Sequence, residues 1–183
     1  REMPDVLIAG GGVIGLSTAW ELAQQGVSVL VLEQARLGQE ASWAGAGMLP
    51  PGNLDMASQG EPALRALSCR HWPGWVERLR SETGIDSGFR NCGRLGLFFD
   101  SQNETDLEFW RGQHVVAEPL SRAELLETEQ EVGERFTSAV RLPQFCQVRN
   151  PRHLKALTAA CLTAGVQFRE GTPVTGWDVE QGR

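Results

Sequence analysis

The fold of this chain is decided near its start, by the stretch DVLIAGGGVIGLSTAWELAQQGVSVLVLE at residues 5–33. An apolar run ends in three glycines, helix formers with apolar residues at helical spacing follow, and a second apolar run ends at Glu33. These patterns predict a strand over residues 5–9, a helix over 13–25 and a buried, parallel-type strand over 27–32. Gly26 stands where a left-handed residue would end the helix. The stretch therefore predicts a βαβ unit.

Three glycines between the first strand and the helix, Gly10, Gly12 and Gly15, follow the spacing G-x-G-x-x-G. Gly10 permits a tight turn, Gly12 lets the backbone approach a pyrophosphate, and Gly15 lets the helix pack closely on the strand. The free N–H groups at the helix N-terminus favour an anion such as a pyrophosphate. The spacing predicts dinucleotide binding, with a purely structural glycine turn as the alternative.

Glu33 lies 21 residues beyond Gly12, at the end of the second predicted strand. A carboxylate in this place can accept hydrogen bonds from both hydroxyls of an adenosine ribose. It also disfavours a 2′-phosphate, so NADP is not expected. The βαβ unit by itself does not distinguish FAD from NAD.

The rest of the chain alternates between short predicted strands and helices. Residues 35–51 are rich in Gly, Ala and Ser and predict a loop, and residues 61–83 predict an amphipathic helix, bent or restarted near Pro73 and Gly74. Its expected apolar side consists of Leu64, Leu67, Trp72, Trp75, Val76 and Leu79. Ser121 with Glu124 predicts a capping box that opens a helix over 122–129. Further strands are predicted over 95–99, 139–142, 166–169 and 174–179, and further helices over 103–111 and 150–163.

Composition and charge narrow the classes of function. The net charge is -6, the pI is about 5.1 and no run of Lys or Arg occurs, so neither nucleic acid nor an anionic membrane surface is an expected partner. No apolar run predicts a membrane span. The four cysteines are widely spaced and predict reduced thiols in a cytoplasmic protein. His71, His114 and His153 stand far apart and are expected at the surface or at helix caps, so no metal site is predicted.

The segment EASWAGAGML at residues 40–49, together with the glycine turn, resembles the glycine oxidases of thiamine biosynthesis. These enzymes belong to the D-amino acid oxidase family of flavoproteins, so the resemblance implies that the dinucleotide is FAD. The resemblance continues through Asn91-Cys92-Gly93 and residues 148–179. Small residues at positions 44–47 agree with it, because they let main-chain N–H groups approach a flat flavin ring. A flexible Ala/Gly linker is the alternative for this segment.

Residue roles follow from the resemblance by matching positions. It implies that the backbone at Val13 and Ile14 contacts the pyrophosphate, and that Glu33 and Gln34 hold the adenosine. The full set of implied FAD-binding residues is Gly10, Gly12, Val13, Ile14, Gly15, Glu33, Gln34, Ala41, Ser42, Ala46, Gly47, Met48 and Val174. No position matches the arginine or the closing loop with which the family binds its substrate, so no catalytic residue is predicted.

The resemblance also implies the fold class and the domain organisation. We expect an α/β protein with a Rossmann-like FAD-binding domain, of the βαβ type found in glutathione reductase, into which part of an α+β substrate domain is inserted. The expected segments are 1–52 and 149–183 for the FAD-binding domain and 53–148 for the partial substrate or cap domain. The C-terminal half of the enzyme is expected to be absent, and the 183-residue chain alone is expected to be inactive.

The reaction implied is the FAD-dependent oxidative deamination of a small amine or amino acid. A hydride passes from the substrate α-carbon to the flavin, the imine hydrolyses to a keto acid and ammonia, and oxygen is reduced to hydrogen peroxide. The predicted partners are the substrate and molecular oxygen, and a homo-oligomer is left open. Three alternatives remain: a dehydrogenase of the same family that uses another electron acceptor, an NAD-dependent dehydrogenase, and a non-catalytic FAD-binding subunit or fragment.

Overall fold

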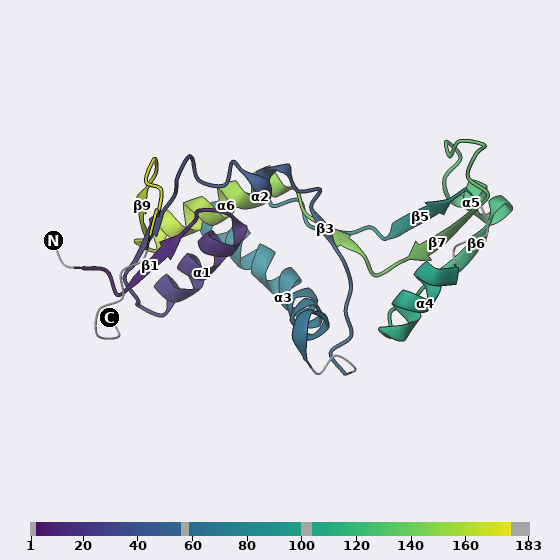
Figure 1. The fold of residues 1–183 in the computed structure, drawn as a ribbon, viewed down its shortest axis with the longest axis horizontal. Coiled ribbons are helices and arrows are strands. Elements are labelled where there is room, and N and C mark those ends of the chain that lie inside the picture. The colour runs from purple at the N-terminus through teal and green to yellow at the C-terminus, as the bar shows by residue number, and fades with distance from the viewer. Residues whose placement is uncertain (1–2, 56–58, 100–103, 177–183) are drawn as a thin grey trace. The chain divides into compact units, whose positions relative to one another are not determined.

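The computed structural model describes residues 3–55, 59–99 and 104–176, which form two compact units (Figure 1). Of the described residues, the first unit comprises 3–47, 76–88 and 149–176, and the second comprises 48–55, 59–75, 89–99 and 104–148. The first unit thus includes residues 76–88, a segment that no sequence pattern assigned to it. The domain boundaries expected from the sequence stay a prediction.

The first unit is built on a parallel sheet with the strand order β1-β2-β9. Strand β1 (Val6–Ala9) leads through helix α1 (Val13–Gln24) to β2 (Val29–Leu32), and helix α6 (Asn150–Thr163) leads to β9 (Gln167–Arg169). The β1–β2 register runs from Val6↔Val29 to Ala9↔Leu32. Both the predicted βαβ unit and the predicted helix over 150–163 are confirmed.

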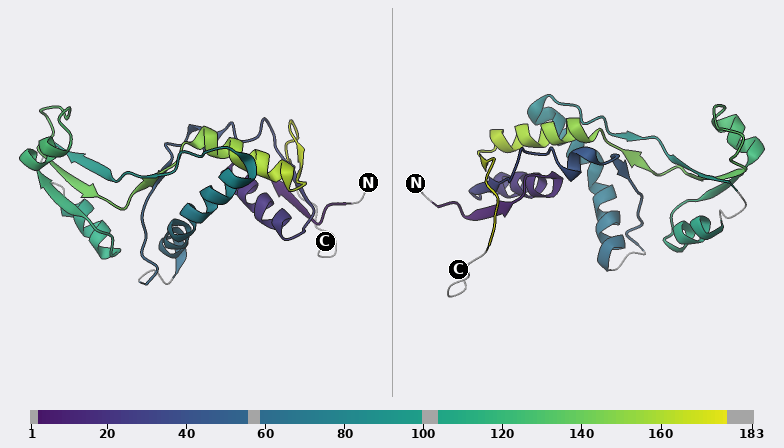
Figure 2. Two further views of the ribbon diagram at one scale, coloured as in Figure 1. Left: turned by 180° about the vertical axis from the view of Figure 1, so that it is seen from behind. Right: turned by 45° about the horizontal axis from the view of Figure 1, so that its top comes forward.

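Helices α1 and α6 pack against each other in the first unit (Figure 2). Leu16 of α1 and Cys161 of α6 are fully buried in this contact, and the Cys161 thiol donates a hydrogen bond to the main-chain oxygen of Leu16 at 3.3 Å. Burial raises the pKa of this thiol to about 12. The thiol therefore stays protonated and packs as a small apolar group.

The sequence predicted a bend or a restart near Pro73, and of these two the restart does not occur, because helix α3 (Gly60–Thr83) runs without interruption through Pro73. Its buried or half-buried positions are Ala63, Arg65, Ala66, Cys69, Trp72, Trp75, Val76, Arg78, Leu79 and Thr83, most of which follow the spacing of one helical face. Leu64 and Leu67 lie off that face, and 69% and 45% of their surfaces are exposed. The expected apolar side was therefore too wide, because it collected apolar residues without requiring a common face.

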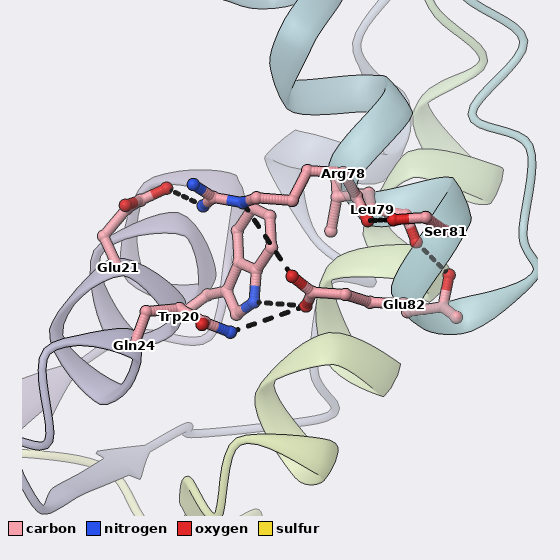
Figure 3. Close-up of polar contacts among 8 residues, drawn as sticks. Trp20, Glu21, Gln24, Arg78, Leu79, Ser81 and Glu82 are labelled. Carbon is pink, nitrogen blue, oxygen red and sulfur yellow. Dashed lines mark hydrogen bonds and ion pairs between the residues drawn. The ribbon is translucent and has the colours of Figure 1, made fainter.

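In the first unit, the last turns of α3 contact α1 through Trp20 (Figure 3). Trp20 is fully buried, and the guanidinium carbon of Arg78 lies 3.9 Å from the centre of its ring. The indole N–H of Trp20 donates to the Glu82 carboxylate at 3.1 Å, and Arg78 also pairs with Glu21. An aromatic ring, a cation over its face and two carboxylates thus tie α3 to α1.

The second unit contains two small antiparallel sheets, visible with their helices in Figure 1. One has the order β3-β8-β4, formed by Met48–Leu49, Cys146–Gln147 and Arg90–Asn91. The other has the order β5-β7-β6, formed by Arg94–Phe98, Ser138–Leu142 and Glu118–Ser121. This unit also contains residues 60–75 of α3 and the helices α4 (Glu104–Gly112) and α5 (Arg122–Thr128), and the capping box of Ser121 and Glu124 is confirmed.

Two sequence expectations differ from the structure at the level of elements. The predicted loop over 35–51 contains a one-turn helix, α2 (Ala41–Ala44), and the short strand β3. Neither element is long enough to produce a recognisable hydrophobic period in the sequence. The predicted strand over 174–179 is absent over residues 174–176, and residues 177–179 lie outside the described part of the chain.

His153 is buried on α6, with 2% of its surface exposed, so the expectation of a surface or capping histidine is wrong there. It shares a helical face with the buried Leu157 and Ala160, at positions i, i+4 and i+7. Its Nδ1 lies 3.2 Å from the hydroxyl of Ser87, and the main-chain oxygen of Ser87 accepts from the N–H of Arg149. The histidine therefore helps to join the segment after α3 to the start of α6.

We expect His153 to make the first unit less stable as the pH falls from about 6.5 to about 4. Burial lowers the pKa of His153 from 6.5 to about 4, so below pH 6.5 the unfolded chain binds a proton that the folded chain does not. The loss is about 3 kcal/mol, because one pKa unit corresponds to about 1.4 kcal/mol. Urea unfolding of the wild type and of His153→Gln at a series of pH values measures it. Parallel stability curves for the two proteins would contradict the assignment.

Candidate functional site

The glycine turn brings strand β1 and helix α1 into unusually close contact. Gly10 has a φ of 102°, which L side chains rarely adopt, and its N–H donates to the main-chain oxygen of Leu32 at 2.8 Å. A Cβ at Gly15 would lie 1.9 Å from the main-chain oxygen of Gly10. The helix therefore crosses the strand at a distance that only a glycine at this position permits.

The N-terminus of α1 is capped by a side chain from a distant part of the chain. Gly12 is the N-cap residue and offers no side chain, but the Ser42 hydroxyl oxygen accepts from the N–H of Val13 at 3.0 Å. A Cβ at Gly12 would lie 2.9 Å from that oxygen. The first turn of α1 carries no acidic residue, and 81% of the Ile14 surface is exposed. With the Val13 N–H capped by Ser42, the other N–H groups of the first turn are the ones that can meet an anionic group such as a pyrophosphate.

Glu33 is buried at the end of β2, with 6% of its surface exposed. One carboxylate oxygen accepts from the N–H of Gly11 at 2.7 Å, and the other accepts from the N–H of Ala35 at 2.8 Å. Each carboxylate oxygen can accept more than one hydrogen bond, so both keep capacity for the hydroxyls of a ribose. The two main-chain donors hold the carboxylate in a fixed orientation beside the glycine turn.

The segment after β9 lies beside the end of β2. The N–H of Thr172 donates to the main-chain oxygen of Glu33 at 2.9 Å, and the N–H of Gly171 donates to that of Ala35 at 3.2 Å. Val174, the position implied for the adenine, follows two residues later with 39% of its surface exposed. Gln34 is exposed at the same end of the sheet. Residues 136 and 139 positions apart in the sequence are thus neighbours here.

The remaining predicted residues lie on the segment that follows β2. Ala41 and Ser42 belong to the one-turn helix α2, Ala46 is exposed, and Gly47 has a φ of 73°. Met48 begins β3, which belongs to the second unit, and 61% of its surface is exposed. Every predicted cofactor residue except Met48 therefore belongs to the first unit. Their contacts to FAD stay predictions.

Three residues of this site were not identified from the sequence. Gly11 stands at a variable position of the glycine motif, yet a Cβ there would lie 2.4 Å from the Leu37 side chain. Ala35 contributes only its N–H group, which no sequence pattern marks. Asn150, at the start of α6, donates from its side chain to the main-chain oxygen of Ser42 at 2.9 Å. In the run Gly10-Gly11-Gly12 the motif marks only the two outer glycines, so the requirement at Gly11 was not visible in the sequence.

Other kinds of site find little support in the structure. No three His, Cys, Asp or Glu side chains among residues 3–55, 59–99 and 104–176 are arranged to hold a metal ion. All four cysteines are free thiols, and burial is the largest cause that raises the pKa of Cys69, Cys146 and Cys161. A raised thiol pKa opposes nucleophilic chemistry at neutral pH. Within the described ranges, no helix is both long and apolar enough to cross a membrane.

Comparisons with known proteins cover almost the whole chain and agree with the family resemblance found in the sequence. The sequence model of the family described as FAD dependent oxidoreductase matches residues 5–183. The glycine oxidase of Pseudomonas putida is 35% identical over 182 residues, which cover 97% of this chain and 49% of that protein. A D-amino acid dehydrogenase of a Methylobacterium species is 30% identical over 233 aligned residues, which cover 97% of this chain and 55% of that protein.

The fold is also that of a solved relative. The crystal structure of a glycine oxidase from Bacillus cereus superposes with a TM-score of 0.85 at 27% sequence identity. The superposition covers 98% of this chain and 49% of that chain. The present chain therefore spans about half the length of the relatives it matches.

Proposed function

Since the chain belongs to the family of FAD-dependent oxidoreductases that includes the glycine oxidases, we propose that it forms the FAD-binding part of an enzyme that oxidises a small amine or amino acid. The observation that carries this proposal is the buried Glu33 carboxylate, held by the N–H groups of Gly11 and Ala35 beside the N-terminus of α1. A ribose acceptor and a pyrophosphate site are then adjacent, as a dinucleotide requires.

The residues present fit the ADP half of FAD. The backbone at Val13 and Ile14 would contact the pyrophosphate at the helix end, with the Ser42 hydroxyl, which caps the Val13 N–H, beside it. Glu33 would accept hydrogen bonds from the ribose hydroxyls, and the main chain at Val174 would lie at the adenine. When bound, FAD supplies the two-electron acceptor that amine oxidation needs, a chemistry that protein side chains lack.

The proposed substrate class and electron acceptor rest on the relatives rather than on this part of the enzyme. Glycine oxidases match the chain over 93–97% of its length, and this supports a substrate as small as glycine or sarcosine. Molecular oxygen is the proposed acceptor, with hydrogen peroxide as product. A dehydrogenase with another acceptor is the second candidate, supported by the D-amino acid dehydrogenases among the relatives. The cytoplasmic location and any homo-oligomer stay predictions.

One experiment with the full-length protein separates these possibilities. The purified protein is expected to show a flavin spectrum, which glycine or sarcosine bleaches under anaerobic conditions. Admission of oxygen should restore the spectrum and release one hydrogen peroxide for each flavin reoxidised. Slow reoxidation by oxygen but fast reoxidation by a quinone would establish the dehydrogenase instead. A colourless protein that binds NAD would overturn the proposal, and the 183-residue chain alone should give no turnover.

Glu33→Gln should weaken FAD binding by about 10- to 100-fold in the full-length protein. Hydrogen bonds to a charged group contribute about 1.5–3 kcal/mol, and the amide would turn one acceptor into a donor that faces a main-chain N–H group. Titration of the apoprotein with FAD, followed by quenching of flavin fluorescence, measures the dissociation constant. Glu77→Gln is the matched control, because Glu77 is exposed on α3. Equal FAD affinities of Glu33→Gln and Glu77→Gln would show that Glu33 does not contact FAD.

A further inference from the structure

We propose that Asn150 is a positioning residue for the cofactor site, which it serves by fixing the one-turn helix α2 against the N-terminus of α1. The inference rests on the proposed function in so far as it concerns FAD. The Asn150 side-chain amide donates to the main-chain oxygen of Ser42 at 2.9 Å, across 108 positions of the sequence. Asn150 is the first residue of α6 and is half-buried, so its amide is held by the helix from which it extends.

Ser42 connects this contact to the glycine turn. Its main-chain oxygen accepts from Asn150, while its hydroxyl oxygen accepts from the N–H of Val13. Three elements, α6, α2 and α1, are therefore joined through one residue. A shift of α2 moves the cap of α1 with it, and the Val13 N–H is one of the groups that would contact the pyrophosphate.

Gly45 shows that the place of the Asn150 amide is tightly specified. Gly45 has a φ of −62°, which any residue adopts, so its backbone conformation does not require glycine. A Cβ at Gly45 would nevertheless lie 2.5 Å from the Asn150 amide nitrogen, whereas the next nearest atom, the main-chain oxygen of Ser42, would be 3.5 Å away. Among the described residues, the amide is therefore the only group that would lie within 3.0 Å of a Cβ at Gly45.

The pair Gly45 and Asn150 allows a test by double substitution. Gly45→Ala should push the Asn150 amide away from Ser42, and Asn150→Ala should remove the amide. Both routes break one contact, so each variant should weaken FAD binding by about 3- to 10-fold, and the double variant should be no weaker than Asn150→Ala alone. Additive losses would overturn the inference, because they would mean that the two residues act separately.

Asn150→Asp separates positioning from a general loss of stability. The carboxylate keeps the shape of the side chain but cannot donate to Ser42, while a negative charge in the first turn of α6 favours the helix. We expect FAD affinity to fall about 10-fold while the melting temperature of the apoprotein is kept. A fall in melting temperature with unchanged FAD affinity would show a merely structural role. Arg152→Ala, an exposed position in the same turn, should change neither.

A second readout needs no flavin. In the full-length apoprotein, hydrogen exchange at the Val13 amide should be faster in Asn150→Asp than in the wild type, because Ser42 would no longer cap that N–H group. Unchanged protection at Val13 would overturn the inference even if the wild type binds FAD. Conversely, a wild type that binds no FAD while Asn150→Asp still deprotects Val13 would refute the proposed function and leave the contact established.

Discussion

Gly15→Ala is expected to abolish FAD binding and to destabilise the first unit by several kcal/mol. The added methyl group would lie 1.9 Å from the main-chain oxygen of Gly10, and side-chain carbons essentially never approach other atoms within 3.0 Å. Neither partner can rotate away, because one is a main-chain atom of the turn and the other is fixed to α1. The helix must then move off the strand, and overpacking of this kind costs at least about 1–3 kcal/mol. Urea unfolding and FAD titration of the full-length protein measure both losses.

Gly74→Ala is the matched control for this prediction. Gly74 is also a glycine within a helix, but a Cβ there would meet nothing within 4 Å. Because alanine is a better helix former than glycine by about 1 kcal/mol, this variant should be as stable as the wild type or more so. If Gly15→Ala behaved like Gly74→Ala, the close crossing of β1 and α1 would be wrong.

Trp20→Ala is expected to cost about 3–5 kcal/mol of unfolding free energy, the range for removal of a large buried aromatic side chain. Trp20 is fully buried, carries the Arg78 guanidinium over its ring and donates to Glu82. The variant would leave a cavity and would deprive both charged partners of their contact with the ring. Urea unfolding followed by circular dichroism measures the loss without depending on tryptophan fluorescence.

Trp43→Ala provides the comparison in the same unit. Nearly half of the Trp43 surface, 49%, is exposed, so the same substitution should cost less than about 1 kcal/mol in the apoprotein. The loss of unfolding free energy for Trp20→Phe should lie between these two values, since phenylalanine keeps a ring below Arg78 but lacks the N–H that donates to Glu82. Similar losses for Trp20→Ala and Trp43→Ala would contradict the role of Trp20 as the link between α1 and α3.

The site shows which structural features a sequence pattern can predict and which it cannot. Gly10, Gly15 and Glu33 were identified because their roles depend on local geometry: a positive φ, a close crossing and the end of a strand. Ser42 was predicted as a cofactor contact, but its function as the cap of Val13 comes from a contact 29 residues away. Asn150 was predicted only as the start of a helix, and its contact with Ser42 depends on how α6 is placed beside α2.

Burial was predicted well for the continuous apolar run of β2 and poorly for helices whose apolar residues are spread over several faces. The run Val29–Leu32 is apolar throughout and is buried or half-buried as expected. In α3, by contrast, apolar residues occur on more than one face, and only the packing of the helix decided that Leu79 is buried while Leu64 is exposed. His153 was assigned to the surface because its residue type is usually found there, although its spacing to Leu157 placed it on the buried face of α6.

The sequence by itself determined the βαβ unit, the glycine turn, the acidic residue that follows it and the family to which the chain belongs. The first three depend on residues close together in the chain, so hydrophobic period, glycine conformation and motif spacing are sufficient to predict them, whereas the family was indicated by the resemblance carried by residues 40–49 and the glycine turn. Only the tertiary structure decided that Gly11 and Ala35 orient Glu33, that Ser42 caps α1 and that Asn150 holds Ser42. These contacts join main-chain groups and segments up to 108 residues apart, and a main-chain N–H has no residue type by which a sequence could mark it.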